Sequence, residues 1–78
     1  MKKAEKKELQ DMVDEIVGIM SHVETFHDMQ EDIYESHSEA WQESDSGDNL
    51  QDIIDILDNA SDCLNDAKDY LEEAIEHA

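Results

Sequence analysis

The chain has few of the residues that interrupt helices or cross-link a small fold: its 78 residues include no proline, one cysteine and two glycines. Cys63 alone cannot form an internal disulfide, so stability has to come from helix packing or from a partner. No apolar run of about 18 residues or more is present, so neither a membrane-spanning helix nor a secretory signal is predicted. We therefore expect a cytoplasmic protein with a thin core.

Positive charge is also scarce. Five Lys and Arg residues stand against 23 Asp and Glu, which gives a net charge of −18 and a pI near 4.1. Such a chain is repelled by nucleic-acid phosphates and by anionic membranes, which argues against direct binding to either. All basic residues except Lys68 lie in residues 1–7, where they oppose the dipole of a following helix, so this segment is expected to be a frayed tail.

Apolar residues recur at spacings of three and four in both halves of the chain, which predicts an all-α fold. We expect helices over residues 8–35 and 49–77, joined by a turn over 36–48. Met12, Met20 and Met29 are expected to fill the core. In the second helix two rows repeat every seventh residue, as in a coiled-coil seam. These rows are Leu50, Leu57, Leu64 and Leu71, and Ala60, Ala67 and Ala74.

The turn is predicted where Ser, Asp, Asn and Gly47 collect. Ser38 is placed to cap a short helical piece that runs through Trp41, and Asp48 with Gln51 has the form of a capping box. Two helices of equal length favour an antiparallel hairpin, forming a single acidic domain over residues 8–78. Apolar residues extend beyond one two-helix contact, so the hairpin is expected either to dimerise into a four-helix arrangement or to dock on another protein.

Acidic residues of the second helix fall on one side of it. At about 100° per residue they occupy an arc of about 120°, opposite the Leu and Ala rows. We call them the acidic stripe: Asp52, Asp55, Asp58, Asp62, Asp66, Asp69, Glu73 and Glu76. All but the last two are Asp, a poorer helix former than Glu that holds its charge close to the helix. Cations four residues away are lacking apart from Lys68, so the stripe is predicted to bind a basic partner or simply to be solvated.

Residues that could support catalysis or metal binding are sparse. Glu24 and His27 have the Glu-x-x-His spacing of di-iron bundles, but the second helix offers no further Glu ligands in its seam, so an ordinary surface pair is expected. Cys63 is expected to be a packed thiol on the shoulder of the Leu row. The prediction is a protein that is not an enzyme and has no cofactor and no metal site.

Trp41, the only tryptophan, lies beside the turn. Two roles are open for it. It can cover the open end of the seam near Leu50, or it can anchor a partner together with the acidic stripe, as tryptophans often do at interfaces.

The segment WQESDSGDNLQDIIDILDNASDCLNDAKDYLEEA carries a resemblance to known proteins. Its turn and acidic helix resemble small acidic helical-hairpin proteins of bacteriophages, including the DNA-mimic inhibitors that act against restriction and CRISPR systems. The resemblance covers about residues 38–74. It implies a stoichiometric inhibitor, working in the host cytoplasm, that occupies the nucleic-acid channel of a defence nuclease.

The expected function is therefore that of a non-catalytic acidic decoy. The stripe would occupy the Lys and Arg residues with which a nucleic-acid-binding protein grips phosphates. Two alternatives remain open from the sequence: a structural or adaptor coiled coil whose apolar seam binds a partner, and an antitoxin or immunity protein for a basic toxin.

Overall fold

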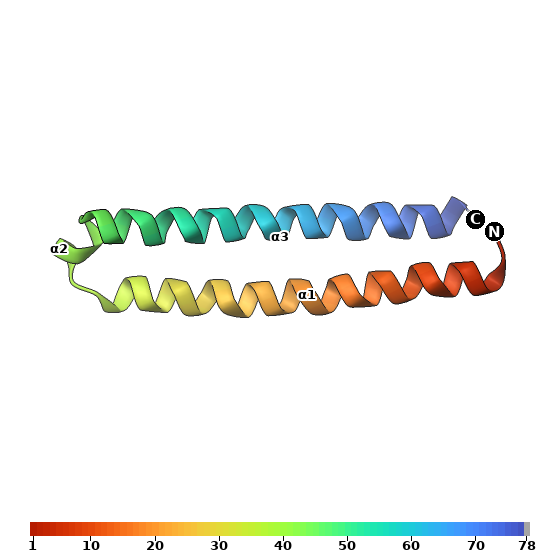
Figure 1. The fold of residues 1–78 in the computed structure, drawn as a ribbon, viewed down its shortest axis with the longest axis horizontal. Helices are drawn as coiled ribbons and strands as arrows, with labels where there is room; N and C mark the ends of the chain where they lie inside the picture. The colour runs from red at the N-terminus through yellow and green to blue at the C-terminus, as the bar shows by residue number, and fades with distance from the viewer. Residues whose placement is uncertain (78) are drawn as a thin grey trace.

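The structure, a computed structural model, describes residues 1–77 and consists of two long helices and one short one. α1 runs from Lys3 to Ser36, α2 from Glu39 to Gln42, and α3 from Asp45 to His77. α1 and α3 lie side by side in opposite directions, with α2 at the turn and the two ends of the chain together at the other end (Figure 1). The predicted all-α fold is confirmed. None of the described helices is long and apolar enough to cross a membrane.

The two long helices pack along a seam whose positions alternate in spacing between three and four residues on each helix. This is the knobs-into-holes pattern of a coiled coil. Val13 and Ile54 are the buried apolar side chains of the seam, each 4% exposed, and its other members are half-buried except buried Gly47. On α1 the seam is formed by Lys6, Leu9, Val13, Ile16, Met20, Val23, His27, Gln30 and Tyr34, and on α3 by Gly47, Leu50, Ile54, Leu57, Ser61, Leu64, Lys68, Leu71 and Ile75.

The seam of α3 therefore differs from the predicted one. The Leu row belongs to it, but the row that accompanies the leucines starts at Ile54 and continues through Ser61 and Lys68 to Ile75, not through the alanines. The Ala row lies beside the seam, where Ala67 is exposed and Ala60 and Ala74 are half-buried. The alanines also repeat every seventh residue, which is why sequence periodicity alone did not separate the two rows.

The first helix begins at Lys3, so the expected frayed tail is wrong for residues 3–7. The carboxylate of Glu5 accepts a hydrogen bond from the backbone N–H of Lys2 at 3.2 Å, which places a negative charge in the first turn, where the helix dipole favours it. Lys7 Nζ lies 3.2 Å from Asp11 Oδ2, one helical turn further on. These two contacts offset the cost of lysines near a helix N-terminus.

The turn is shorter than predicted because α3 begins at Asp45 rather than at about Asn49. Ser44, not Asp48, caps it: the Ser44 Oγ accepts from the backbone N–H of Gly47 at 3.3 Å. The cap on α2 was predicted correctly, since Ser38 Oγ accepts from the Trp41 backbone N–H at 3.3 Å.

Gly47 lies in the first turn of α3 and not in the loop. It is buried, and a Cβ at this position would overlap the carbonyl oxygens of Trp41 and Gln42. Glycine is therefore required by the close approach of α2 to α3. At Gly18, in the middle of α1, a Cβ would meet nothing within 4 Å.

The two glycines provide a matched test of this packing. We expect Gly47→Ala to lower the free energy of unfolding by about 1 to 3 kcal/mol, because backbone has to move to admit the methyl group. Gly18→Ala should raise it by about 1 kcal/mol through helix propensity. Urea unfolding followed by circular dichroism at one chain concentration measures both. Equal effects of the two substitutions would contradict the placement of α2 against Gly47.

Candidate functional site

The seam divides the surface of the hairpin into two faces of different chemistry. Along one edge of the seam lie mostly polar residues: Gln10, Val17, Glu24 and Glu31 of α1, and Gln51, Asp58, Asn65 and Glu72 of α3. We call this side, with the acidic stripe next to it on α3, the acidic face. Along the other edge lie Met12, Ile19, Phe26 and Ile33 of α1, and Ile53, Ala60, Ala67 and Ala74 of α3. We call this side the apolar face.

All residues of the acidic stripe are exposed, as the sequence predicted from their spacing. The structure separates Asp58 from the other seven, however, because Asp58 lies at the edge of the seam and contacts α1. The other members lie farther round α3, away from α1. They form one line of carboxylates along the helix, with steps of three or four residues, about 4.5 to 6 Å, except for the seven-residue step of about 10.5 Å between Asp55 and Asp62.

Most carboxylates of the stripe have no cationic partner. Lys68 Nζ lies 3.7 Å from Asp69 Oδ1, and His77 Nε2 lies 3.9 Å from Glu73 Oε1. Among residues 1–77, no Lys or His atom comes within ion-pair distance of five others, namely Asp52, Asp55, Asp62, Asp66 and Glu76. The stripe is therefore a row of like charges open to solvent, which is costly for the isolated fold and attractive to a basic surface.

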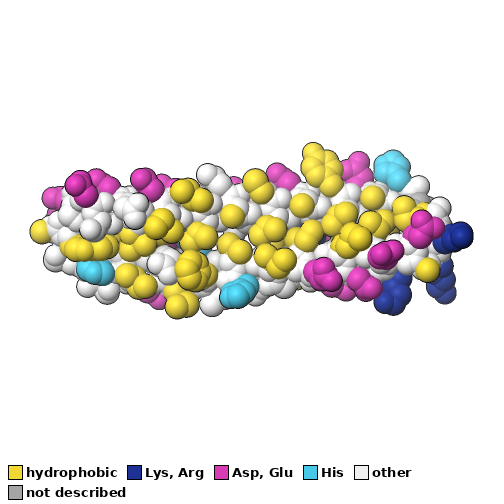
Figure 2. Space-filling view, in the orientation of Figure 1, with side chains coloured by type: hydrophobic (Ala, Val, Ile, Leu, Met, Phe, Trp, Pro, Cys, Tyr) yellow, Lys and Arg dark blue, Asp and Glu magenta, His cyan; other side chains and the backbone are white. Residues whose placement is uncertain are grey.

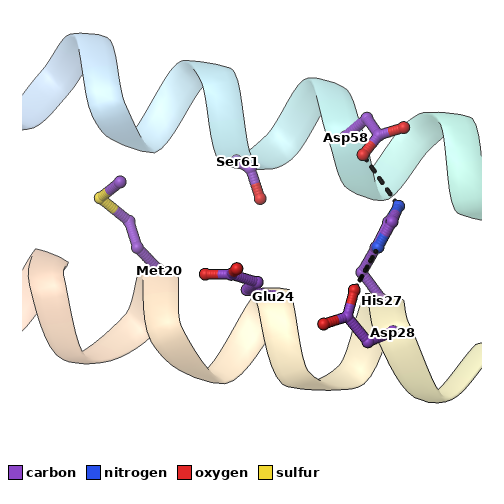
Figure 3. Close-up of a pocket in the computed structure, with 6 residues that line it drawn as sticks. All are labelled: Met20, Glu24, His27, Asp28, Asp58 and Ser61. Carbon is purple, nitrogen blue, oxygen red and sulfur yellow. Dashed lines mark hydrogen bonds and ion pairs between the residues drawn. The ribbon is translucent and has the colours of Figure 1, made fainter.

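His27 joins the two helices on the acidic face. Its side chain is only 13% exposed, and its Nε2 atom lies 2.8 Å from Asp58 Oδ1 of α3 and 3.4 Å from Glu31 Oε1. Its Nδ1 atom lies 3.2 Å from Asp28 Oδ1 (Figure 3). The contact with Asp58 is an ion pair without hydrogen-bond geometry, since Nε2 has no hydrogen-bond partner in the described residues. One imidazole thus faces three carboxylates from two helices.

These carboxylates raise the pKa of His27 above its ordinary value of 6.5. The hydrogen bond with Asp28 contributes most, burial acts in the opposite direction, and the charges of Asp58 and Glu31 raise the pKa further. The protonated ring is therefore the form that holds α1 to α3. The sequence prediction of an ordinary surface pair is wrong for His27, which occupies a seam position.

A hollow of about 310 Å³ lies beside His27 on this face. It is lined by Met20, Glu24, His27, Asp28, Asp58 and Ser61, with Glu24 and Ser61 directed into the space between the helices (Figure 3). His27, Asp28 and Glu31 each offer one ligand atom within 4.8 Å of the others and are the residues that could hold a metal ion. Metal binding needs a neutral imidazole, whereas the surrounding carboxylates favour the protonated one.

Trp41 packs against aromatic residues of its own turn. Its ring stacks on His37, with centroids 3.7 Å apart, and meets Tyr34 edge-on at 6.4 Å. Gln42, its neighbour, donates from Nε2 to the carbonyl oxygens of Tyr34 and His37 at 3.0 and 3.2 Å, which satisfies the C-terminal end of α1. Trp41 is half-buried in this arrangement, so only part of its ring is left for a partner.

Comparison of this chain with known protein families, characterised proteins and solved structures finds no match. Its function is therefore inferred from its own surface. The sequence prediction located the acidic stripe but missed His27 and Lys68 as seam residues. The sequence does contain a signal for both residues. Lys68 stands seven residues from Ser61 and from Ile75, and His27 stands seven residues from Met20 and from Tyr34.

The raised pKa of His27 predicts a specific dependence of stability on pH. Because the pKa is higher in the folded state, the contribution of His27 is complete below about 6.5 and is lost as the pH rises through the folded-state value. We expect the difference in urea midpoint between wild type and His27→Gln to be largest near pH 5.5 and to shrink toward pH 8.5.

His22→Gln is the matched control, because His22 is an exposed histidine of the same helix without an ion pair in the described residues. Its urea midpoint should run parallel to that of wild type over the whole pH range. A constant difference between wild type and His27→Gln would show that His27 contributes by packing and not by its charge.

Proposed function

We propose that this chain acts without catalysis as an acidic decoy for a nucleic-acid-binding protein. The observation that supports the proposal most directly is the row of exposed and mostly unpaired carboxylates along α3. A basic channel that grips phosphates offers the cations that this row lacks. The resemblance to phage inhibitors extends the proposal to a nuclease of a bacterial defence system.

The physical basis of the mimicry is a regular spacing of charge on a stiff support. Phosphates of one DNA strand follow each other at about 3.4 Å along the axis and farther apart along the winding backbone, while the stripe advances by about 4.5 to 6 Å per carboxylate. Asp side chains have few rotatable bonds, so their charges are well positioned by the helix. Cations of the target would also relieve repulsion within the stripe, so that binding removes a cost the free hairpin carries.

The stripe also explains how such a complex would respond to salt. Attraction between exposed charges is screened at high ionic strength, because the Debye length falls from about 10 Å at 0.1 M to about 4 to 5 Å at 0.5 M. A decoy complex should therefore weaken with added salt. A partner held by apolar residues of the hairpin should persist, which distinguishes the decoy from an adaptor coiled coil.

The decisive variant removes four charges from the stripe: Asp55, Asp62, Asp66 and Asp69 changed to Asn. Tagged wild type is used to capture partners from a nuclease-treated bacterial lysate, and a captured protein is then tested for displacement of a fluorescent DNA duplex. We expect the variant to displace the duplex at least about tenfold less well, a loss of about 1.4 kcal/mol of binding free energy.

A matched control removes four exposed acids outside the stripe by changing Asp14, Asp32, Glu35 and Glu43 to their amides. It has the same net charge as the stripe variant and should retain most of the activity. If both variants lost the same amount of displacement activity, the activity would depend on net charge and not on the position of the stripe. The decoy would be excluded if the stripe variant displaced the duplex as well as wild type does. It would also be excluded if competing DNA did not release the captured proteins.

A further inference from the structure

The apolar face of the hairpin carries large side chains that are exposed to solvent. Its α1 side carries large side chains every seventh residue, and Ile19 and Phe26 are 51% and 46% exposed. The exposed large apolar side chains of the described residues lie on this side, apart from Met1 and Val17: Met12, Ile19, Phe26, Met29, Ile33, Ile53, Ile56 and Tyr70. Met12 and Met29 were expected in the core and lie here instead. Figure 2 shows the apolar residues as a band that follows both helices.

A face of this kind is unusual for a chain that works alone. Contiguous apolar patches larger than a few hundred Å² usually mark an interaction site. In residues 1–77, Val13 and Ile54 are the only apolar side chains of the seam that are exposed by less than a tenth, and no disulfide compensates for this thin core. Small scaffolds with so little core commonly gain stability by oligomerisation.

From these features we infer that the apolar face binds a second copy of this chain, which gives an antiparallel four-helix dimer. The large exposed apolar side chains of this face extend from Met12 to Ile33 on α1 and from Ile53 to Tyr70 on α3, a length of about 25 to 32 Å at 1.5 Å per residue. Its rows repeat every seventh residue from Met12 to Ile33 on α1 and from Ile53 to Ala74 on α3. A partner with the same repeat and the same length matches such rows best, and the chain itself is one.

The distribution of charge fixes the orientation of the two copies. Lys2, Lys3, Lys6 and Lys7 lie at the end where the chain termini meet. Figure 2 shows dark blue and magenta side chains together at this end, since Glu5, Glu8, Glu72, Glu73 and Glu76 lie there as well. The opposite end, around α2, carries Glu39, Glu43, Asp45 and Asp48. A two-fold axis across the helices places the mixed-charge end of each copy, which carries the four lysines, over the acidic turn of the other, whereas an axis along the helices places the two acidic turns together.

The acidic stripe remains free in this dimer, since it lies on the side of α3 away from the apolar face. The two copies still repel each other through their net charge of −18 each. Salt screens this repulsion and strengthens apolar contacts relative to it, so dimerisation should become tighter with salt. The decoy complex should weaken with salt, which is the opposite dependence. The dimer proposal and the decoy proposal can therefore be contradicted separately.

Sedimentation equilibrium of the full chain tests the dimer. At about 100 μM chain and about 0.5 M NaCl we expect twice the 9.0 kDa mass of one chain, with a dissociation constant several-fold lower than at about 0.1 M. A monomer under both conditions would overturn the inference. Assemblies larger than a dimer would overturn it as well, because a second copy should cover the face completely.

Two substitutions at residues of similar exposure identify which face forms the dimer contact. Ile19→Gln changes a 51% exposed residue of the apolar face, and Val17→Gln changes a 49% exposed residue of the acidic face. We expect the first to raise the dissociation constant about tenfold or more and the second to change it less than about twofold. Circular dichroism confirms that both variants keep their helices. Equal effects would place the contact elsewhere.

The orientation is tested with spin labels at the turn, using Glu43→Cys in a Cys63→Ser background. The native thiol has to be removed because Cys63 is exposed and not packed as the sequence predicted. In the antiparallel dimer the two labels are separated by roughly the length of the hairpin, which pulsed electron resonance resolves. Labels close together would show that the turns meet, which contradicts the charge-based orientation.

Discussion

The packing of α1 against α3 along one seam determines the rest of the molecule. The seam residues of each helix are spaced alternately by three and four positions, so that each helix presents one narrow row to the other. The other residues of each helix then lie on one side of this row or on the other. The hairpin has little else to hold it, because Val13 and Ile54 are its only buried apolar side chains in the described residues. The acidic face and the apolar face therefore both follow from the register in which α1 packs against α3.

The electrostatics of this register oppose the fold and, in the proposed function, supply the contacts with a basic partner. Seven carboxylates of the stripe lie on the solvent side of α3, where Lys68 and His77 reach only Asp69 and Glu73. His27 places one imidazole against Asp58, Asp28 and Glu31 and links the two helices there, and these carboxylates raise its pKa. In the proposed dimer the two stripes lie on opposite outer sides of the bundle, much as a duplex carries phosphates on two strands.

The sequence alone predicted the helical class, the position of the turn and the exposure of the stripe, because these depend on local periodicity and capping. It placed α3 with the wrong cap and set the Ala row in the seam, because two rows with the same seven-residue repeat are indistinguishable until a partner helix selects one of them. The roles of His27 and Gly47 depend on contacts between segments distant in sequence, His27 with Asp58 and Gly47 with the carbonyls of α2. A local sequence pattern does not predict contacts between such distant segments.

The central claim is that the stripe takes the place of nucleic-acid phosphates in the binding site of another protein. The most direct measurement compares two affinities of one captured target, for the hairpin and for a DNA duplex, across a series of salt concentrations. If the claim is right, both affinities fall as salt is raised, and each ligand excludes the other at every concentration. An affinity for the hairpin that stays constant while that for DNA falls, or simultaneous binding of both ligands, would contradict it.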